Sequence, residues 1–193
     1  MLERPELPRR ESNDFLDMPC NAVGYFSTGE CLQIRELSAS FSTMEGGVSD
    51  KGTLAHDIRS SNIRWMTPTT GNQWVFEKLW AAVEQVNQCY RFELDGIREV
   101  QIARYGQGDF YDWHVDIGKA VTSTRKLSVS VQLSDPGSYE GGELVVQYHE
   151  DKEPVKEFGS VTVFPSYLSH RVNRIIRGER WSLVAWVHGP AFR

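Results

Sequence analysis

The chain has 193 residues, 40% of them hydrophobic and 24% charged, with a formal net charge of -5. These values are ordinary for one soluble globular domain with a sizeable core. The acidic balance and the lack of a long basic run argue against nucleic acid as a partner. No apolar run approaches the ~18 residues that a membrane-spanning helix needs.

The three cysteines, Cys20, Cys31 and Cys89, are odd in number and form no C-x-x-C pair. That usage favours free thiols in a reducing compartment over a disulfide framework. The N-terminus, M-L-E-R-P-E-L-P, is charged and broken by prolines, unlike a secretory signal. We therefore expect a cytoplasmic protein without a membrane segment.

The N-terminal part of the chain predicts an irregular arm over residues 1–14. Ser27 and Glu30 have the spacing of a capping box, and the residues that follow suit a short helix. Residues 43–54, T-M-E-G-G-V-S-D-K-G-T-L, are polar and rich in glycine, and we expect a mobile loop that closes as a lid.

Two regular elements are expected next. Asp57 to Met66 predicts a strand that carries Arg59 and Arg64. Asn72 to Arg91 predicts the clearest helix, since large apolar side chains recur there at helical spacing: Phe76, Leu79, Trp80, Val83, Val86 and Tyr90. Such a stripe is typical of a core-facing helix and not of a ligand site.

From about residue 98 the pattern changes to a period of two, with turn signals between short strands. No linker or repeat divides the chain. We therefore expect one domain over residues 1–193, with helical support and the lid loop over 15–97 and the β core over 98–193.

Two of these strands have faces that can be read separately. Lys126 to Ser134 alternates apolar residues with Ser and Gln, and Arg180 to Val187 alternates apolar residues with Arg180, Ser182 and Trp186. A half-exposed surface strand gives the same alternation. We favour a cleft, with the apolar faces packed on helices such as 72–91 and the polar faces turned into a barrel or between two sheets.

The stretch Gln101 to Asp116 ends in His114-Val115-Asp116. On an extended chain an imidazole and a carboxylate two residues apart lie on the same side and form two of the ligands of a metal site. The motif also arises by chance, so it needs a third ligand. The remaining histidines are His56, His149, His170 and His188.

His170 is the candidate that we favour. It follows a buried-looking strand that ends near Pro165, and Arg180 comes ten residues later. Two histidines and one carboxylate form the facial triad of non-haem Fe(II) oxygenases, which leaves positions for a 2-oxo acid and for O2. A buried arginine such as Arg180 is suited to pair with the distal carboxylate of 2-oxoglutarate.

Several motifs in order resemble the prolyl 4-hydroxylase-like branch of the Fe(II)/2-oxoglutarate-dependent dioxygenases, and the bacterial PKHD-type hydroxylases in particular. They are Y-D-W-H-V-D, R-K-L-S-V-S-V-Q-L-S-D-P, E-G-G-E-L, V-F-P-S-Y-L-S-H-R-V and G-E-R-W-S-L-V-A-W. The resemblance covers roughly residues 57–192. It implies a mainly β fold, a double-stranded β-helix (jelly-roll) core with N-terminal helices packed on the major sheet.

The resemblance also implies roles for single residues. His114, Asp116 and His170 would bind iron, and Arg180, assisted by Ser182, would hold the 5-carboxylate of 2-oxoglutarate. Further residues are implied in the cosubstrate pocket or on its inner wall: Tyr105, Gln132 and Trp186. Gln132 stands where some relatives have a tyrosine, which leaves its role open.

The implied reaction is hydroxylation of an unactivated C–H bond of an amino acid, a peptidyl residue or another small molecule, with release of succinate and CO2. Candidate substrate contacts are Arg59, Arg64, Tyr111, Trp113 and Trp186, and an arginine near the pocket mouth tilts the expectation towards a small acid. Desaturation or cyclisation at the same iron site is an alternative. From other classes, a zinc hydrolase and a non-catalytic jelly-roll binding module stay open.

Overall fold

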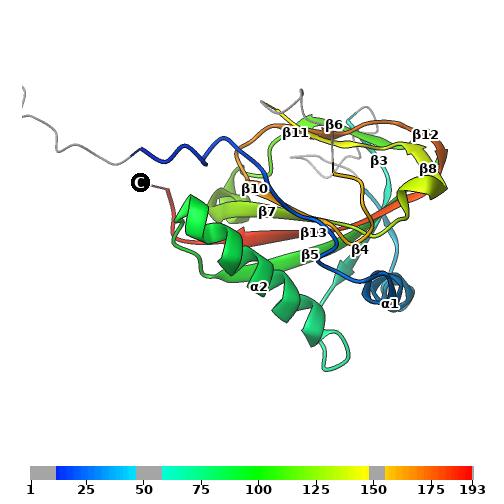
Figure 1. Cartoon of the computed structure of the whole chain (residues 1–193), viewed down its shortest axis with the longest axis horizontal. Helices are drawn as coiled ribbons and strands as arrows, with labels where there is room; N and C mark the ends of the chain where they lie inside the picture. The colour runs from blue at the N-terminus through cyan, green and yellow to red at the C-terminus, as the bar shows by residue number, and fades with distance from the viewer. Residues whose placement is uncertain (1–11, 47–57, 148–154, 193) are drawn as a thin grey trace, which may run out of the picture.

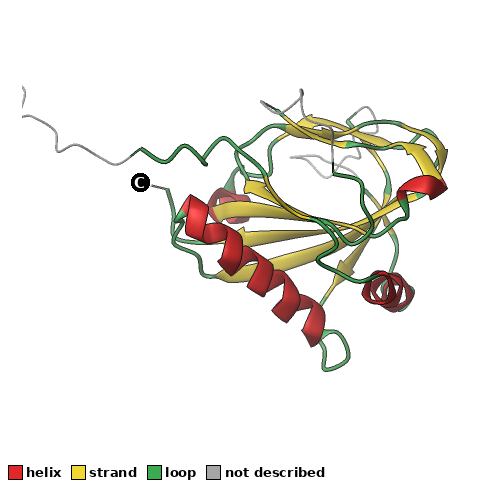
Figure 2. Cartoon of the chain, viewed as in Figure 1, coloured by secondary structure: helices red, strands yellow, loops and turns green. Residues whose placement is uncertain are grey.

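The computed structural model describes residues 12–46, 58–147 and 155–192. Antiparallel strands dominate, and the two longest helices lie outside the sheets (Figures 1 and 2). The major sheet has the order β1 (Cys20–Ala22), β10 (Val161–Pro165), β7 (Arg125–Gln132), β13 (Arg180–His188), β5 (Gly96–Tyr105), β4 (Asn62–Met66) and β2 (Met44–Glu45).

The minor sheet faces the major one across the interior (Figure 1). Its order is β3 (Arg59–Ser60), β6 (Phe110–His114), β11 (His170–Val172) and β9 (Leu144–Val146). Beside it, β8 (Tyr139–Gly141) pairs with β12 (Ile175–Gly178). Two short 3-10 helices, Ala120–Thr124 and Pro136–Ser138, precede β7 and β8.

The two α-helices begin and end close to where the sequence predicts. Helix α1 (Thr28–Ser38) starts at the predicted capping box, which is confirmed: the Ser27 hydroxyl accepts from the Glu30 amide, and the Glu30 carboxylate accepts from the Ser27 amide. Helix α2 (Gln73–Tyr90) ends at Arg91, whose left-handed backbone with φ 59° stops further helical hydrogen bonding.

The main hydrophobic core lies between α2 and the outer face of the major sheet. Leu79 and Val83 of α2 are fully buried there. The sheet contributes the alternate apolar side chains of its two central strands: Leu127, Val129, Val131, Leu183, Ala185 and Val187. The predicted stripe on this helix therefore faces the core, and burial of these side chains anchors the sheet that carries the site.

The opposite faces of the same strands point between the two sheets. There β13 carries Arg180, Ser182 and Trp186, and β7 carries Ser128 and Ser130. Because side chains alternate along a strand, one set of strands serves the core on one side and a polar interior on the other.

The prediction of one continuous strand over Asp57 to Met66 is wrong, because the described part of this range forms two strands, β3 and β4. The chain passes from one sheet to the other at Ser61, so that Arg59 pairs with Tyr111 of β6 while Asn62 pairs with Arg104 of β5. The side-chain alternation continues through the break and so does not reveal it.

The stretch Gln101 to Asp116 is a hairpin and not one extended segment. Strand β5 ends at Tyr105, a turn with Gly108 at φ 87° follows, and β6 begins at Phe110. Of the predicted loop over 43–54, Met44–Glu45 forms a short edge strand, and residues 47–54 lie outside the described parts. Across the residues that the structure covers, no helix is both long and apolar enough to cross a membrane.

Candidate metal centre

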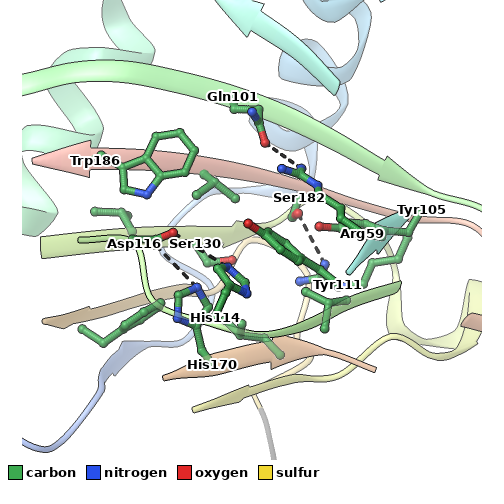
Figure 3. A pocket seen from close by; sticks show the side chains of 16 residues that line it. Arg59, Gln101, Tyr105, Tyr111, His114, Asp116, Ser130, His170, Ser182 and Trp186 are labelled. Carbon is green, nitrogen blue, oxygen red and sulfur yellow. Dashed lines mark hydrogen bonds and ion pairs between the residues drawn. The ribbon is translucent and has the colours of Figure 1, made fainter. Parts of the chain in front are cut away.

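His114, Asp116 and His170 meet at one end of the space between the sheets (Figure 3). His114 is the last residue of β6, and it pairs directly with His170, the first residue of β11. Asp116 follows in the bend, where its backbone amide donates to the Ser166 carbonyl over 2.9 Å. A carboxylate oxygen lies 3.8 Å from His114 Nε2 and the other 3.5 Å from His170 Nε2. The three ligand atoms all lie within 4.8 Å of one another.

Both histidines present the same nitrogen to this cluster. Nδ1 of His114 lies 2.8 Å from the Asp112 carbonyl, and Nδ1 of His170 lies 3.0 Å from the Leu168 carbonyl. A carbonyl oxygen only accepts, so Nδ1 carries the proton in each ring. Each Nε2 therefore keeps its lone pair, as a metal ligand requires.

Protonation states in the cluster suit a cation. Burial lowers the pKa of His114 to about 4, and the neighbouring His170 adds to this effect. Burial disfavours the charged form of Asp116, but the two histidines and the Ser128 hydroxyl outweigh it and hold the pKa of this carboxyl below its usual value. A neutral imidazole and a carboxylate anion are therefore ready to bind metal at neutral pH.

A second layer of side chains fixes the carboxylate. The Ser128 hydroxyl donates to Asp116 over 2.6 Å and lies 3.0 Å from the Ser166 hydroxyl. Arg125 donates to the Asp116 backbone carbonyl over 3.2 Å, and its guanidinium stacks 4.1 Å from the ring centre of Trp186. The Trp186 indole lies beside Asp116 (Figure 3).

We expect Ser128→Ala to weaken metal binding by about 10- to 100-fold, because it removes the hydroxyl that orients Asp116. Titration of the metal-free protein with Fe(II) or Mn(II) measures the change. Ser166→Ala is the matched control, since the Ser166 side chain reaches the Asp116 carboxylate only through the Ser128 hydroxyl. Its effect should be smaller, and equal losses from both variants would contradict the assignment.

The cluster opens into a cavity between the sheets, with about 460 Å³ of space that includes its opening to solvent. Two arginines line it, Arg59 from the minor sheet and Arg180 from the major sheet. Other lining side chains are mainly aromatic or small and polar: Gln101, Tyr105, Tyr111, Ser130, Phe164, Ser182 and Trp186. The cavity thus combines the cluster of candidate metal ligands with two cations, of which Figure 3 labels Arg59.

Arg180 is only 3% exposed, and its Nε has no hydrogen-bond partner among the described residues. Nη1 donates to the Ser182 hydroxyl over 3.4 Å, and the Tyr105 ring centre lies 5.7 Å from the guanidinium carbon. Gly142, with φ 67°, passes against it, since a Cβ there would lie 3.1 Å from Arg180 Cδ. A buried guanidinium with a free donor is suited to a carboxylate.

The structure separates the residues that the sequence singles out into two groups. Those that line the cavity with the metal ligands are Arg59, Tyr105, Tyr111, Arg180, Ser182 and Trp186. Three others do not line it. Gln132 donates its amide to the Tyr139 hydroxyl, Trp113 stacks under Arg171, and Arg64 stacks over Trp181.

Several cavity and second-layer residues were missed from the sequence. Gln101 and Ser130 line the cavity, while Ser128 and Arg125 contact Asp116. Ser128 and Ser130 lie on the polar face of a strand already recognised as two-faced, so alternation alone could have found them. Nothing in the local pattern marks Gln101 or Arg125.

The donor set fits an iron centre with a 2-oxo acid. Two imidazole nitrogens and one carboxylate on one side of a cavity match the facial triad of non-haem Fe(II) oxygenases. The unpartnered Nε of buried Arg180 fits the distal carboxylate of 2-oxoglutarate. Between these two points, small side chains such as Ser130 and Ser182 leave room for a short carbon chain.

Comparison with known proteins gives one family. Residues 100–188 match the model of the 2OG-Fe(II) oxygenase superfamily. A PKHD-type hydroxylase of Hyphomonas neptunium is 33% identical over 150 residues, covering 74% of this chain and 66% of the relative. A PKHD-type hydroxylase of a Synechococcus species is 36% identical over 95 residues, covering 47% and 42%. The matches thus span less than two thirds of either relative's length.

Solved structures share the fold. A prolyl-4-hydroxylase of Pseudomonas putida superposes with a TM-score of 0.67 at 21% identity, over 92% of this chain and 97% of its own. A Trichoplax adhaerens prolyl hydroxylase, solved with a peptide fragment of the hypoxia inducible factor, gives a TM-score of 0.71 at 18% identity, over 89% and 84%.

Proposed function

Because this chain belongs to the 2OG-Fe(II) oxygenase superfamily, as a member of PKHD/prolyl 4-hydroxylase type, we propose that it hydroxylates an unactivated C–H bond. The substrate is an amino acid, a peptidyl residue or another small molecule that enters the cavity between the sheets. The observation that carries the proposal is the meeting of His114, Asp116 and His170 with buried Arg180 in one cavity.

In this proposal His114, Asp116 and His170 hold Fe(II). The Nδ1 hydrogen bonds to backbone carbonyls fix both imidazoles in the ligating tautomer. Arg180 and Ser182 hold the 5-carboxylate of 2-oxoglutarate, and Tyr105 forms the wall beside them. These residues position the cosubstrate with its 2-oxo acid end towards the metal.

Iron with 2-oxoglutarate supplies the oxidising chemistry: 2-oxoglutarate, O2 and R–H become succinate, CO2 and R–OH, with one oxygen atom in succinate and one in the alcohol. The protein contributes binding, orientation and exclusion of water. Asp116 contributes one negative charge, so the Fe(II) site keeps a net positive charge that favours the 2-oxo acid. Trp186 and Phe164 form an apolar surround that keeps water from the reacting centre.

The proposed function goes with a proposed domain architecture and location. We infer a single domain with a double-stranded β-helix core, supported by the two facing antiparallel sheets and by the solved prolyl hydroxylases of similar fold. The core shared by α2 and the major sheet supports helices packed on that sheet. The free cysteines support a cytoplasmic location.

The proposal predicts a weak visible charge-transfer band when Fe(II) and 2-oxoglutarate are added together without oxygen. In air the same mixture should release succinate, and a chelator should abolish both signals. Fe(II) alone and Zn(II) with 2-oxoglutarate are the controls, and neither should give the band. Absence of both the band and succinate would refute the oxygenase assignment. Hydrolysis of ester or amide substrates in the presence of Zn(II) would favour a zinc hydrolase.

A further inference from the structure

We propose that Arg59 binds a carboxylate of the primary substrate, so that the substrate is a small carboxylic acid: a free amino acid or the C-terminal residue of a peptide. The inference rests on the proposed function and specifies its substrate class. The observation behind it is that Arg59 is a buried cation close to the metal ligands. The hydrogen-bond partners of Arg59 among the described residues are all neutral.

Arg59 is held rigidly between the two sheets. Its backbone belongs to β3 in the minor sheet, and its side chain crosses to the major sheet. Nε donates to the Ser61 hydroxyl and Nη2 to the Gln101 amide oxygen, each over 2.8 Å. The residue is 7% exposed and lines the cavity. Its guanidinium plane is thus fixed before any ligand binds, which lowers the entropic cost of binding.

The positive charge of Arg59 has no carboxylate partner in the described parts of the chain. A serine hydroxyl and an amide oxygen satisfy two nitrogens but do not neutralise the cation. The nearby Asp109 carboxylate is bonded instead to the Ser60 hydroxyl and to the Gly106 amide. Burying a charge is costly unless it is paired, so this site favours an anion that comes from outside the chain.

A stack of three groups joins Arg59 to the metal centre. The guanidinium carbon lies 4.6 Å from the ring centre of Tyr111. The Tyr111 ring in turn stacks on His114, with ring centres 3.5 Å apart and planes at 11°. An acid group held at Arg59 therefore lies one aromatic ring away from an iron ligand. The β to δ carbons of an amino acid lie two to four bonds of ~1.5 Å from the carboxyl carbon, and in this proposal one of them is the carbon presented to the metal centre.

The Arg59 site is distinct from the Arg180 site. Arg59 bonds to Gln101, whereas Arg180 pairs across the sheet with Tyr105, four residues further along β5. At ~3.3 Å per residue the two levels are about 13 Å apart along the strand. The triad lies near the first level, because Ser128, which contacts Asp116, pairs with Trp186 of β13. Trp186 pairs in turn with Glu99 of β5, so along this strand Gln101 lies nearer to the triad level than Tyr105 does. The two cations therefore lie at different distances from the metal centre, and each can hold a separate carboxylate.

Arg64 on β4, the next strand in the chain, provides a matched control for Arg59. It differs from Arg59 by an odd number of positions, and its guanidinium lies over Trp181, on the outer side of the major sheet. It does not line the cavity. Loss of its charge should therefore leave substrate binding unchanged.

The test uses the protein loaded with Fe(II) and saturating 2-oxoglutarate without oxygen, after the charge-transfer band has shown that both are bound. Ligand-observed NMR then screens the common L-amino acids, their amides, and tripeptides with free or amidated C-termini. We expect binding of at least one free acid and at least tenfold weaker binding of its amide. Free amino acids and free-acid peptides distinguish the two sources of the carboxylate.

Three variants locate the effect. Arg59→Gln should weaken binding of that acid at least tenfold and leave the 2-oxoglutarate titration of the band unchanged, and Arg64→Gln should change neither. Gln101→Glu keeps the size of the side chain but places a carboxylate on Arg59, so it should weaken acid binding without lowering the melting temperature.

Any of four results overturns the inference. They are equal binding of acid and amide, no binding of any free acid, unchanged binding in the Gln101→Glu protein, and loss of 2-oxoglutarate in the Arg59→Gln protein. The last would assign Arg59 to the cosubstrate. Absence of the band in the unmodified protein would instead refute the proposed function itself.

Discussion

We expect His170→Ala to lower iron-dependent succinate formation by more than ~100-fold. Loss of a proposed iron ligand should cost more than loss of an outer-shell contact, which costs about 10- to 100-fold. His170 is 5% exposed, and its Nε2 lies 3.5 Å from the Asp116 carboxylate. Among the described residues, the cluster contains no histidine besides His114 and His170, so none is available to replace His170. Succinate formation at saturating Fe(II) and 2-oxoglutarate measures the loss.

The control for this prediction is His149→Ala. His149 lies in a charged segment, Y-H-E-D-K-E, outside the described residues. Its replacement should leave turnover at the level of the unmodified protein. Comparable losses from the two variants would show that the wrong histidine has been chosen as the third ligand.

We expect Arg180→Gln to raise the concentration of 2-oxoglutarate needed for half-saturation at least ~30-fold. Breaking a buried charge pair costs ~2–5 kcal/mol of binding free energy, and the lower value corresponds to this factor. Arg180→Lys recovers only part of this loss, since a lysine cannot form the bidentate pair. Affinity for Fe(II) alone should not change, because Arg180 is not a metal ligand. Titration of the charge-transfer band measures the cosubstrate affinity, and Fe(II) binding followed separately is the internal control.

An unchanged 2-oxoglutarate affinity in the Arg180→Gln protein, with the Arg59→Gln protein defective instead, would exchange the assignments of the two arginines. The two variants together therefore test which cation faces which ligand. Ser182→Ala should give a smaller effect than Arg180→Gln, since the Ser182 hydroxyl only accepts a 3.4 Å hydrogen bond from the guanidinium.

Local patterns predicted much of this molecule. The capping box at Ser27 and the helix over residues 72–91 depend on contacts within a few residues, and the structure has both. The two faces of the strands could be predicted because the alternation of side chains follows from strand geometry alone. The motif His114-Val115-Asp116, the place of His170 after a buried-looking strand and the family resemblance together indicated the metal cluster. Nothing local shows that His170 pairs with His114, 56 positions earlier in the chain.

The errors have physical reasons as well. Alternation fixes the side of a strand but not its partner, so the change of sheet at Ser61 was invisible. The same alternation, if it had been used, would have separated Arg59 from Arg64, because residues of opposite parity point to opposite faces. The family resemblance pointed to Gln132 in the pocket but left its role open. Gln132 does not line the cavity, and its amide donates to the Tyr139 hydroxyl, a contact that depends on tertiary packing.

The position of β13 has a consequence for how the protein is made. This strand follows every other strand in chain order, yet it lies between β7 and β5 at the middle of the major sheet. Until it emerges from the ribosome, β5 and β7 are two unpaired edges that can join other chains. The same strand carries Arg180 and Ser182. In a nascent chain, Arg180 and Ser182 therefore take their places in the cavity only in the step that closes the sheet.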